Sequence, residues 1–227
     1  MPTPLKLAKA TAAAALPLAW ANYALPALGL RIRGRSAANA TAATIYATVF
    51  HGTPNWLSTR GLRTGGSAAA LILTGYGVAL SIPSVRRHLA ELDRSPEVSH
   101  AEWASTHIPG GTVYSEELVY RATLNPILDD TFGDHGKWLG ALVFGFAHIQ
   151  PARSVGDPVP ATVAVTALAG LAFDELRCRT GSATAPALAH LALNAGGALA
   201  PAVARRIEHI RTVRMGASWR GWRFRNR

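Results

Sequence analysis

Uncharged, largely apolar runs alternate with short charged segments along most of the chain. Five runs contain no Asp, Glu, Lys or Arg, and they cover residues 10–30, 36–59, 64–85, 158–173 and 180–204. Several of them reach the roughly 20 residues that a helix needs to cross a bilayer. The pattern therefore predicts membrane-spanning helices that are joined by short polar loops.

Up to seven helices are expected from this pattern. The clearest are residues 11–30, 67–84, 158–176 and 184–204. Segments 112–130 and 138–152 are also apolar but contain ionisable residues. Segment 37–50 is weaker, because it is rich in Ala and Thr and could lie at the membrane interface or inside the protein. The expected fold class is all-α, a transmembrane bundle of about six to seven helices.

The first apolar run has two interpretations. Lys6 and Lys9 precede it, and Ala19-Trp20-Ala21 resembles a signal-peptide cleavage site. However, the run continues to Leu30 and ends at a basic cluster that begins with Arg31. A retained membrane helix is therefore the favoured interpretation.

Composition and charge placement support a membrane protein with a defined orientation. Charged residues make up 16% of the chain, below the about 25% of soluble domains. The only cysteine, Cys178, excludes an intramolecular disulfide. With seven spans and a cytoplasmic C-terminus, 15 of the 23 Lys and Arg residues lie on the cytoplasmic side and 7 outside. The positive-inside rule therefore predicts a cytoplasmic C-terminus, although Lys6 and Lys9 mildly oppose an outside N-terminus.

The basic tail at residues 205–227 accounts for most of the net charge of +10. It contains eight arginines, and three of them, Arg220, Arg223 and Arg225, alternate with Trp219, Trp222 and Phe224. Next to a membrane helix, this pattern favours binding to anionic lipid headgroups, with the aromatic rings at the interface. A nucleic-acid partner is not expected, because the charge is concentrated in this tail.

Three charges stand inside one apolar segment, SEELVYRATL at 115–124. Glu117 and Arg121 are four residues apart and can pair on one helix face. Glu116 is rotated by about 100° and must face something else. The simplest alternative is a helix start at the membrane surface. Asp174 and Glu175, further along, are expected to form local ion pairs at a helix end.

Two further apolar segments place a histidine on the same helix face as a second residue. Phe144 and His148 are four residues apart, as are His190 and Asn194. Each pair alone is compatible with an ordinary structural role. Together with Glu116, however, they could converge on one hydrated pocket.

Two kinds of chemistry are open to such a pocket. A carboxylate and two imidazoles, here Glu116, His148 and His190, can form a hydrolytic zinc site. Without a metal, the carboxylate can activate water while His and Asn stabilise an oxyanion.

These motifs resemble the CPBP family of intramembrane proteases, which includes CAAX prenyl endopeptidases and bacteriocin self-immunity proteins. The family pattern E-E-x-x-x-R, F-x-x-x-H and H-x-x-x-N is matched at 116–121, 144–148 and 190–194. The resemblance implies peptide-bond hydrolysis at or within the membrane. It assigns the catalytic groups to Glu116, His148, His190 and Asn194, and supporting roles to Glu117, Arg121 and Phe144.

The resemblance covers residues 110–200 and suggests a division of the chain. We expect N-terminal membrane helices and a cytoplasmic loop at 1–110, a catalytic core at 111–204 and the basic tail at 205–227. The expected substrate is a membrane peptide or a prenylated, CAAX-type protein. The Ala- and Arg-rich composition is typical of GC-rich bacteria, which suggests the bacterial cytoplasmic membrane. The alternative is a catalytically inactive scaffold or a transporter-like protein of the same fold.

Overall fold

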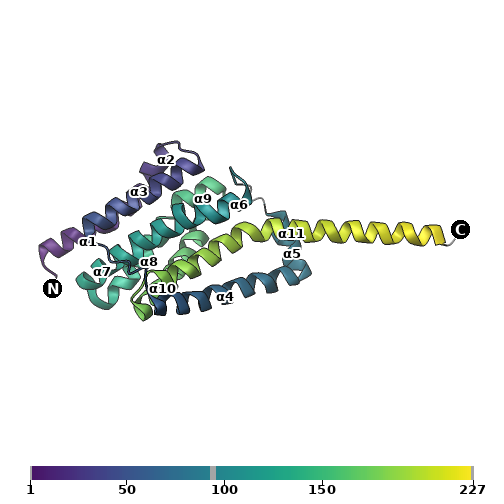
Figure 1. The fold of residues 1–227 in the computed structure, drawn as a ribbon. Coiled ribbons are helices and arrows are strands. Elements are labelled where there is room, and N and C mark those ends of the chain that lie inside the picture. The colour runs from purple at the N-terminus through teal and green to yellow at the C-terminus, as the bar shows by residue number, and fades with distance from the viewer. Residues whose placement is uncertain (1, 93–95, 226–227) are drawn as a thin grey trace.

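The computed structural model describes residues 2–92 and 96–225, with side chains described as far as Thr212. Within these residues the structure is helical and contains no strand, so the expected all-α bundle is confirmed. Helices run roughly lengthwise through the molecule and are joined at its two ends (Figure 1). The expected division at residue 110 falls within a continuous helical segment and stays a prediction.

Seven helical segments correspond to the seven that the sequence predicts. The first is continuous through α1 (Pro4–Ala19), η1 (Trp20–Ala24) and α2 (Leu25–Ala27), and the second is α3 (Ile32–Phe50). The third is α4 (Thr59–Ser81), bent into α5 (Pro83–Glu91). The fourth joins α6 (His100–Glu102), η2 (Trp103–Tyr114), η3 (Glu117–Leu124) and α7 (Asn125–Phe132). After the short η4 (Gly133–His135) come α8 (Gly136–Phe146) with α9 (Ile149–Val155), α10 (Val159–Thr180) and α11 (Thr184–Arg225).

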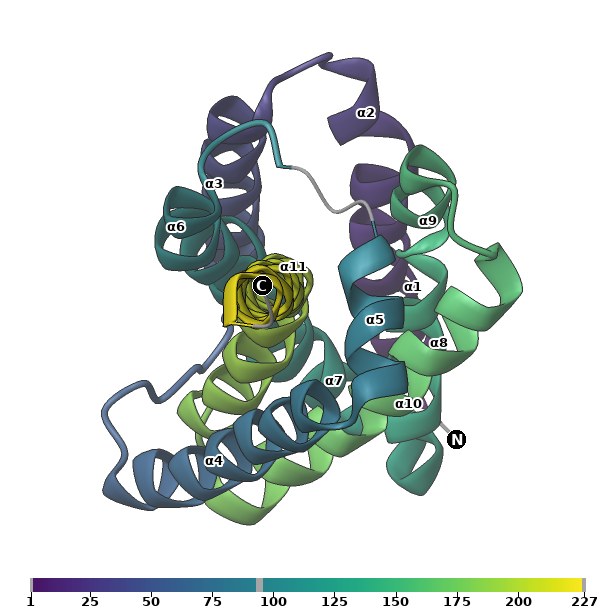
Figure 2. The ribbon, with the colours of Figure 1, turned by 90° about the vertical axis from the view of Figure 1, so that its right-hand side faces the viewer.

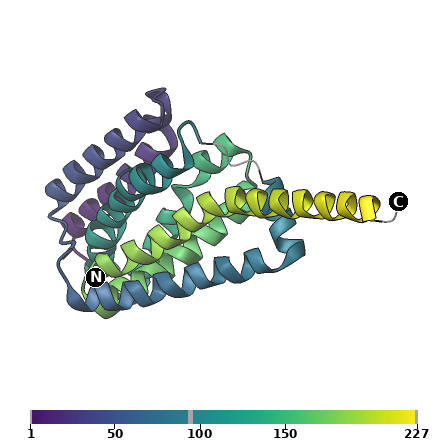
Figure 3. The ribbon, with the colours of Figure 1, turned by 45° about the vertical axis from the view of Figure 1, so that its right-hand side comes forward.

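The segments alternate in direction, so the start of α1 and the end of α11 lie at opposite ends of the molecule (Figure 1). Figure 2 looks along α11, and Figure 3 shows α4 running beside it. Helix α11 packs between α4, α10 and η2, and α10 in turn packs on α8. Helix α10 therefore contacts both α8 and α11, two of the helices that carry the family motifs.

Local sequence signals explain where several helices begin and end. Thr3 caps α1, because its hydroxyl accepts a bond from the Lys6 N–H at 3.3 Å, and Pro4 occupies a position that needs no amide donor. Helix α10 ends at Gly181, whose φ of +65° is left-handed and suits glycine. Helices α4 and α5 meet at 98°, where Pro83 follows Ile82.

Two helices in the described part of the chain are long and apolar enough to cross a membrane. They are Val159–Thr180 and Thr184–Thr212, and the bent pair α4 and α5 adds a third if it is counted as one span. The weakly predicted segment 37–50 belongs to a regular 19-residue helix, α3. The other predicted segments form helices too, but they fall short of this test of length and hydropathy.

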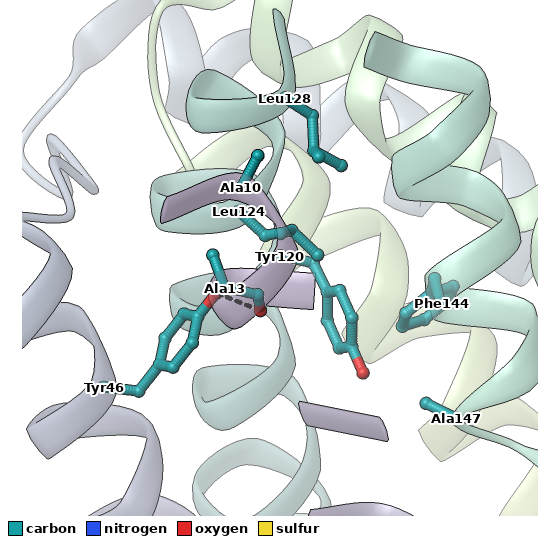
Figure 4. Packing of buried hydrophobic residues seen from close by; sticks show 8 residues of the cluster. All are labelled: Ala10, Ala13, Tyr46, Tyr120, Leu124, Leu128, Phe144 and Ala147. Atoms are coloured by element: carbon teal, nitrogen blue, oxygen red, sulfur yellow. Dashed lines mark hydrogen bonds between the residues drawn. The ribbon is translucent and has the colours of Figure 1, made fainter. Parts of the chain in front are cut away.

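A small-residue core joins α1 to the helices that carry the polar motifs (Figure 4). Ala10 and Ala13 of α1 are almost fully buried, and the Tyr46 hydroxyl of α3 donates to the Ala13 carbonyl at 2.8 Å. Tyr120 packs edge-on against Phe144 with ring centroids 4.9 Å apart. Small residues let membrane helices approach closely, and this contact fixes α1 against η3 and α8.

The fourth helical segment has an unexpected geometry, because η2 and η3 are π-helical. Two hydroxyls follow this wider ladder. The Ser115 hydroxyl donates to the Gly110 carbonyl, and the Thr123 hydroxyl to the Leu118 carbonyl, each five residues back. An α-helix over 112–130 was the sequence prediction, so the helical state is confirmed but its hydrogen-bond register is not. π-Helical turns are rare and often occur at functional sites.

Candidate functional site

Glu117 and His190 form the buried centre of the site. Glu117 is fully buried in η3, and His190 of α11 is 3% exposed. A Glu117 carboxylate oxygen, Oε1, lies 2.8 Å from the His190 Nδ1 and 3.3 Å from the Arg121 Nη1. The ion pair predicted between Glu117 and Arg121 is therefore present. Its carboxylate also holds one nitrogen of the imidazole.

Glu116 approaches the other nitrogen of the same ring. Its Oε2 lies 3.7 Å from the His190 Nε2, while the Glu116 side chain remains 24% exposed. The same oxygen is buried and makes no hydrogen bond within the described part of the chain. His190 is thus flanked by two carboxylates, one fully buried and one partly exposed.

His148 lies where α8 breaks before α9. Its Nδ1 is 2.7 Å from the Phe144 carbonyl. Because a carbonyl can only accept, Nδ1 carries the proton in the neutral ring and Nε2 carries the lone pair. The His148 ring also packs edge-on against Phe144, at 4.8 Å between centroids. The free lone pair makes this imidazole suitable for holding a water molecule or a metal ion.

Aromatic rings fix the buried cation and His190. The Arg121 guanidinium carbon lies 4.2 Å from the Phe144 ring centroid and 5.1 Å from that of Phe173. Phe173 of α10 stacks on His190 at 4.7 Å with planes 23° apart. Gly170 of α10 lies close to Phe144, since a Cβ there would be 3.1 Å from the Phe144 ring. Phe173 was not predicted, because it belongs to none of the three motifs.

A cavity of about 410 Å³ opens beside Glu116 and His148. Its wall comes mainly from apolar side chains of the first helical segment, α3 and the fourth helical segment, including Leu16, Trp20, Ile45, Tyr46, Val49, Val119 and Tyr120. Asn39 also lines it, accepting from the Trp20 indole at 2.8 Å and donating to the Gly111 carbonyl at 3.1 Å. The cavity is therefore an apolar space with two catalytic candidates on its wall.

The four proposed catalytic residues are not all at this cavity. Glu116 and His148 line it, whereas His190 and Asn194 are absent from the described lining. His190 joins the site through its approach to Glu116. Asn194 lies one turn further along α11 and is half-buried. The structure thus links Glu116, Glu117, Arg121, Phe144, His148 and His190 through direct contacts or the shared cavity.

The metal alternative requires three converging ligands, for which the candidates are Glu116, His148 and His190. Among the residues that the structure describes, no group of three or more His, Cys, Asp or Glu side chains is arranged to hold a metal ion. The arrangement therefore does not fit a three-ligand metal centre, and no step of the chemistry below passes through a metal.

In the second acidic pair, Asp174 and Glu175, only one residue forms the local ion pair that the sequence predicts. Glu175 pairs with Arg179 at 2.6 Å, as expected. Asp174 is instead buried, and its carboxylate accepts a bond from the Asn125 side-chain amide at 2.7 Å. This contact ties the fourth helical segment to α10 and so helps to hold η3 in place.

Comparison with known families matches residues 103–196 to the model described as Type II CAAX prenyl endopeptidase Rce1-like. Comparison with curated proteins and with solved structures gave no match. The matched segment contains all seven residues that the motifs single out, from Glu116 to Asn194. Together with the apolar helices, it identifies an integral membrane protein. Residues 103–196 of this chain are therefore similar to the Rce1-like type II CAAX prenyl endopeptidases, which supports the resemblance of the three motifs to the CPBP family of intramembrane proteases.

Proposed function

We propose that this protein hydrolyses a peptide bond in a membrane-associated substrate, using a water molecule activated by Glu116 and His148. The observation that carries the proposal is the position of these two side chains on the wall of one otherwise apolar cavity. They come from two different helical segments. A carboxylate and an imidazole at such a boundary can hold water beside an apolar substrate.

In the attack step, Glu116 is the general base. Water held between Glu116 and the His148 Nε2 donates a proton to the Glu116 carboxylate, and its oxygen adds to the carbonyl carbon of the substrate. The Phe144 carbonyl keeps His148 in the tautomer that accepts a hydrogen bond from this water. Collapse of the tetrahedral intermediate breaks the C–N bond, and the Glu116 proton passes to the departing amine.

His190 and Asn194 are assigned to the oxyanion. Glu117 and the Phe173 ring hold the His190 imidazole, so that its Nε2 faces Glu116. When that nitrogen carries a proton, it can donate to the developing oxyanion. Asn194, one turn away on α11, can supply a second donor from its side-chain amide. Donors fixed before the reaction stabilise such charge most effectively.

The cavity favours an apolar substrate segment. Its volume of about 410 Å³ is within the about 300–1,000 Å³ typical of ligand sites. We propose a prenylated, CAAX-type peptide as the substrate class, with the apolar group in the cavity and the scissile bond beside Glu116. A peptide with another lipid group, or a strongly apolar peptide, would in the same way place an apolar group in the cavity and a peptide bond beside Glu116.

We further propose that the protein resides in a bacterial cytoplasmic membrane with its C-terminus in the cytoplasm. Charge placement supports this orientation. The basic tail would then bind anionic lipid headgroups. The side chains of residues 213–227 lie outside the described set, so Trp219, Trp222, Phe224 and most tail arginines enter only through the sequence.

Cleavage by the purified protein in lipid nanodiscs tests the proposal. Matched peptides with and without a farnesyl group are incubated with wild type, Glu116→Gln and His148→Ala, and the products are identified by mass spectrometry. We expect cleavage of the farnesylated peptide by wild type and a loss of about 100-fold or more in each variant, because both remove proton handling. Thermal unfolding of each variant controls for folding.

Cleavage measured before and after treatment with a strong chelator distinguishes the metal-free mechanism from a zinc-dependent one. We expect unchanged cleavage after metal removal. Loss of cleavage that zinc restores would overturn the metal-free mechanism but leave the protease. Failure of wild type to cleave any peptide in a broad apolar panel would favour the inactive scaffold instead.

A further inference from the structure

The helix break at His148 leaves one specific backbone bond unmade. In an uninterrupted α-helix the Gln150 N–H would donate to the Phe146 carbonyl, four residues earlier. Here α8 ends at Phe146, and α9 starts at Ile149. His148 lies in the chain between the Phe146 carbonyl and the Gln150 N–H, and its backbone has φ −93° and ψ 5°. Its backbone direction therefore depends on what holds those two groups.

Asn22 of η1 bonds to both groups through its side-chain amide. Its Nδ2 donates to the Phe146 carbonyl at 3.0 Å, and its Oδ1 accepts from the Gln150 N–H at 2.9 Å. The second Nδ2 hydrogen goes to the Leu18 carbonyl of its own helix at 3.1 Å. The amide is thus inserted into the gap in the helical ladder, with both its donors and its acceptor in use.

The hydrogen bonds from Asn22 that replace the lost backbone bond stabilise the protein more in a membrane than they would in water. Backbone groups that a broken helix frees at membrane depth find no bulk water, and each costs several kcal/mol when unsatisfied. Neighbouring side chains must therefore bond them. Asn22 is 124 residues from one partner and 128 from the other. The contact therefore links the N-terminal helix to the catalytic helix pair α8 and α9.

We infer that Asn22 is a positioning residue for His148. Its amide fixes the backbone on both sides of the histidine, and so aims the His148 Nε2 at the water beside Glu116. Asn22 lies outside the family-matched segment 103–196. It is also absent from the described lining of the cavity. The inference rests on the proposed function for its kinetic consequence, while the clamp itself can be tested without activity.

The kinetic test compares the same chemical change at two asparagines. Asn22→Leu keeps the approximate size but removes every hydrogen bond, and we expect kcat to fall about 10- to 100-fold with KM little changed, because misplaced catalytic groups lower kcat without altering substrate binding. Asn39→Leu changes the cavity wall, and there we expect the larger effect on KM. Tyr23→Leu, at a side chain 76% exposed on the same helix, controls for insertion and should leave both constants near wild type.

A pH series with Asn22→Asp asks whether the two bonds themselves matter. An ionised aspartate accepts from the Gln150 N–H but cannot donate to the Phe146 carbonyl. A protonated one can do both. The ratio of variant to wild-type kcat should therefore rise as the pH falls, whereas a purely steric role for Asn22 predicts a constant ratio.

Hydrogen–deuterium exchange gives the readout that does not need activity. In Asn22→Leu, the segment 146–152 should exchange faster than in wild type, while α4 should remain unchanged. Faster exchange in a protein that cleaves nothing would support the clamp and reject the protease. Unchanged exchange, or Asn22→Leu with wild-type kcat, would overturn the role assigned to Asn22. If Asn22→Leu does not fold, the exchange and kinetics of Asn22→Asp decide the question in the same way.

Discussion

At the scale of single residues, Glu117 has the greatest number of roles in the site. It is fully buried, neutralises Arg121 and holds the His190 Nδ1. Its neighbour Glu116 has the opposite environment, partly exposed and at the cavity. Two adjacent carboxylates therefore divide between two environments, one buried among its partners and one at the cavity wall. The sequence motif alone predicts this division only through the four-residue spacing to Arg121.

Removal of one partner of the buried pair should destabilise the protein. Glu117→Ala leaves the Arg121 charge buried without its carboxylate, and Arg121→Met leaves the Glu117 charge likewise. Breaking such a pair costs about 3–5 kcal/mol. We expect a large fall in the thermal unfolding temperature for each single variant, measured in detergent or nanodiscs.

The double variant, Glu117→Ala with Arg121→Met, is the informative control. It removes both charges, so its loss of stability should be clearly smaller than the sum of the two single losses. Glu116→Gln serves as a matched change at the neighbouring, partly exposed carboxylate and should alter the unfolding temperature little. Additive losses would show that Glu117 and Arg121 do not act as a pair.

At the scale of elements, the positions of charges predicted most of what the structure shows. Charged residues mark the loops, so all seven helical segments are located from the sequence, even the weak segment at 37–50. The π-helical register of η2 and η3, which both pack against α3, could not be predicted from the spacing of residues. The same holds for the break before His148, which needs Asn22 from a distant helix.

Most residues of the candidate site were also predicted from the sequence. The spacing of ionisable residues located Glu116, Glu117, Arg121, His148 and His190. The amides of Asn22 and Asn39 were overlooked, since they neither interrupt a charge-free run nor share a four-residue spacing with a histidine. Polar amides inside membrane helices usually bond a neighbouring helix, and that signal could have identified both. The pairing of Phe173 with His190 required the tertiary structure.

The start of the fourth helical segment is anchored by a partly exposed carboxylate. Glu102 accepts bonds from Arg33 at 2.8 and 3.1 Å and contacts the His107 Nε2 at 3.1 Å. These bonds, first to Arg33 and then to His107, lower the pKa of Glu102 from 4.5 to about 2. Close by, Glu97 bonds Arg35 and the Ile32 N–H, which lowers its pKa as well.

This anchor should weaken in acid. A lowered carboxyl pKa stabilises the folded state fully above pH 4.5, and the contribution is lost as the pH falls from there toward about 2. We expect segment 99–107 to exchange hydrogen faster over that interval, in a pulse-labelling experiment corrected for the intrinsic rate. Glu102→Gln should already exchange faster at neutral pH and lose most of the dependence. An identical profile in wild type and variant would contradict the role of Glu102.

At the scale of the whole molecule, two parts of the chain have different tasks. The family segment at 103–196 supplies the ionisable groups. The N-terminal helices supply much of the cavity wall and the Asn22 amide at the helix break. Neither part makes the site alone. Substitutions in the N-terminal helices should therefore change substrate choice and rate, even though this region contains no motif of the family.

The arrangement of the helix ends also determines the topology of the protein in its membrane. Successive segments alternate in direction, so the loop after α3 and the helix α5 lie at opposite ends (Figures 1 and 3). The excess of Lys and Arg on the α5 side supports our proposal that this end faces the cytoplasm. Cysteines placed at the two ends should therefore react with a membrane-impermeant maleimide from opposite sides.

In a Cys178→Ser background, Leu57→Cys offers a suitable outer position, since Leu57 is 99% exposed between α3 and α4. His88→Cys offers the matched inner position on α5, where the native side chain is exposed. We expect labelling of the cysteine at 57 in intact cells and of the cysteine at 88 only after permeabilisation, with no label on Cys178→Ser alone. The reverse pattern would invert the orientation, and labelling of both in intact cells would contradict the alternation of spans. The reverse pattern would also place Glu102 and the basic tail on the side of the membrane away from the cytoplasm. The lipid-binding role proposed for the tail therefore depends on the same measurement.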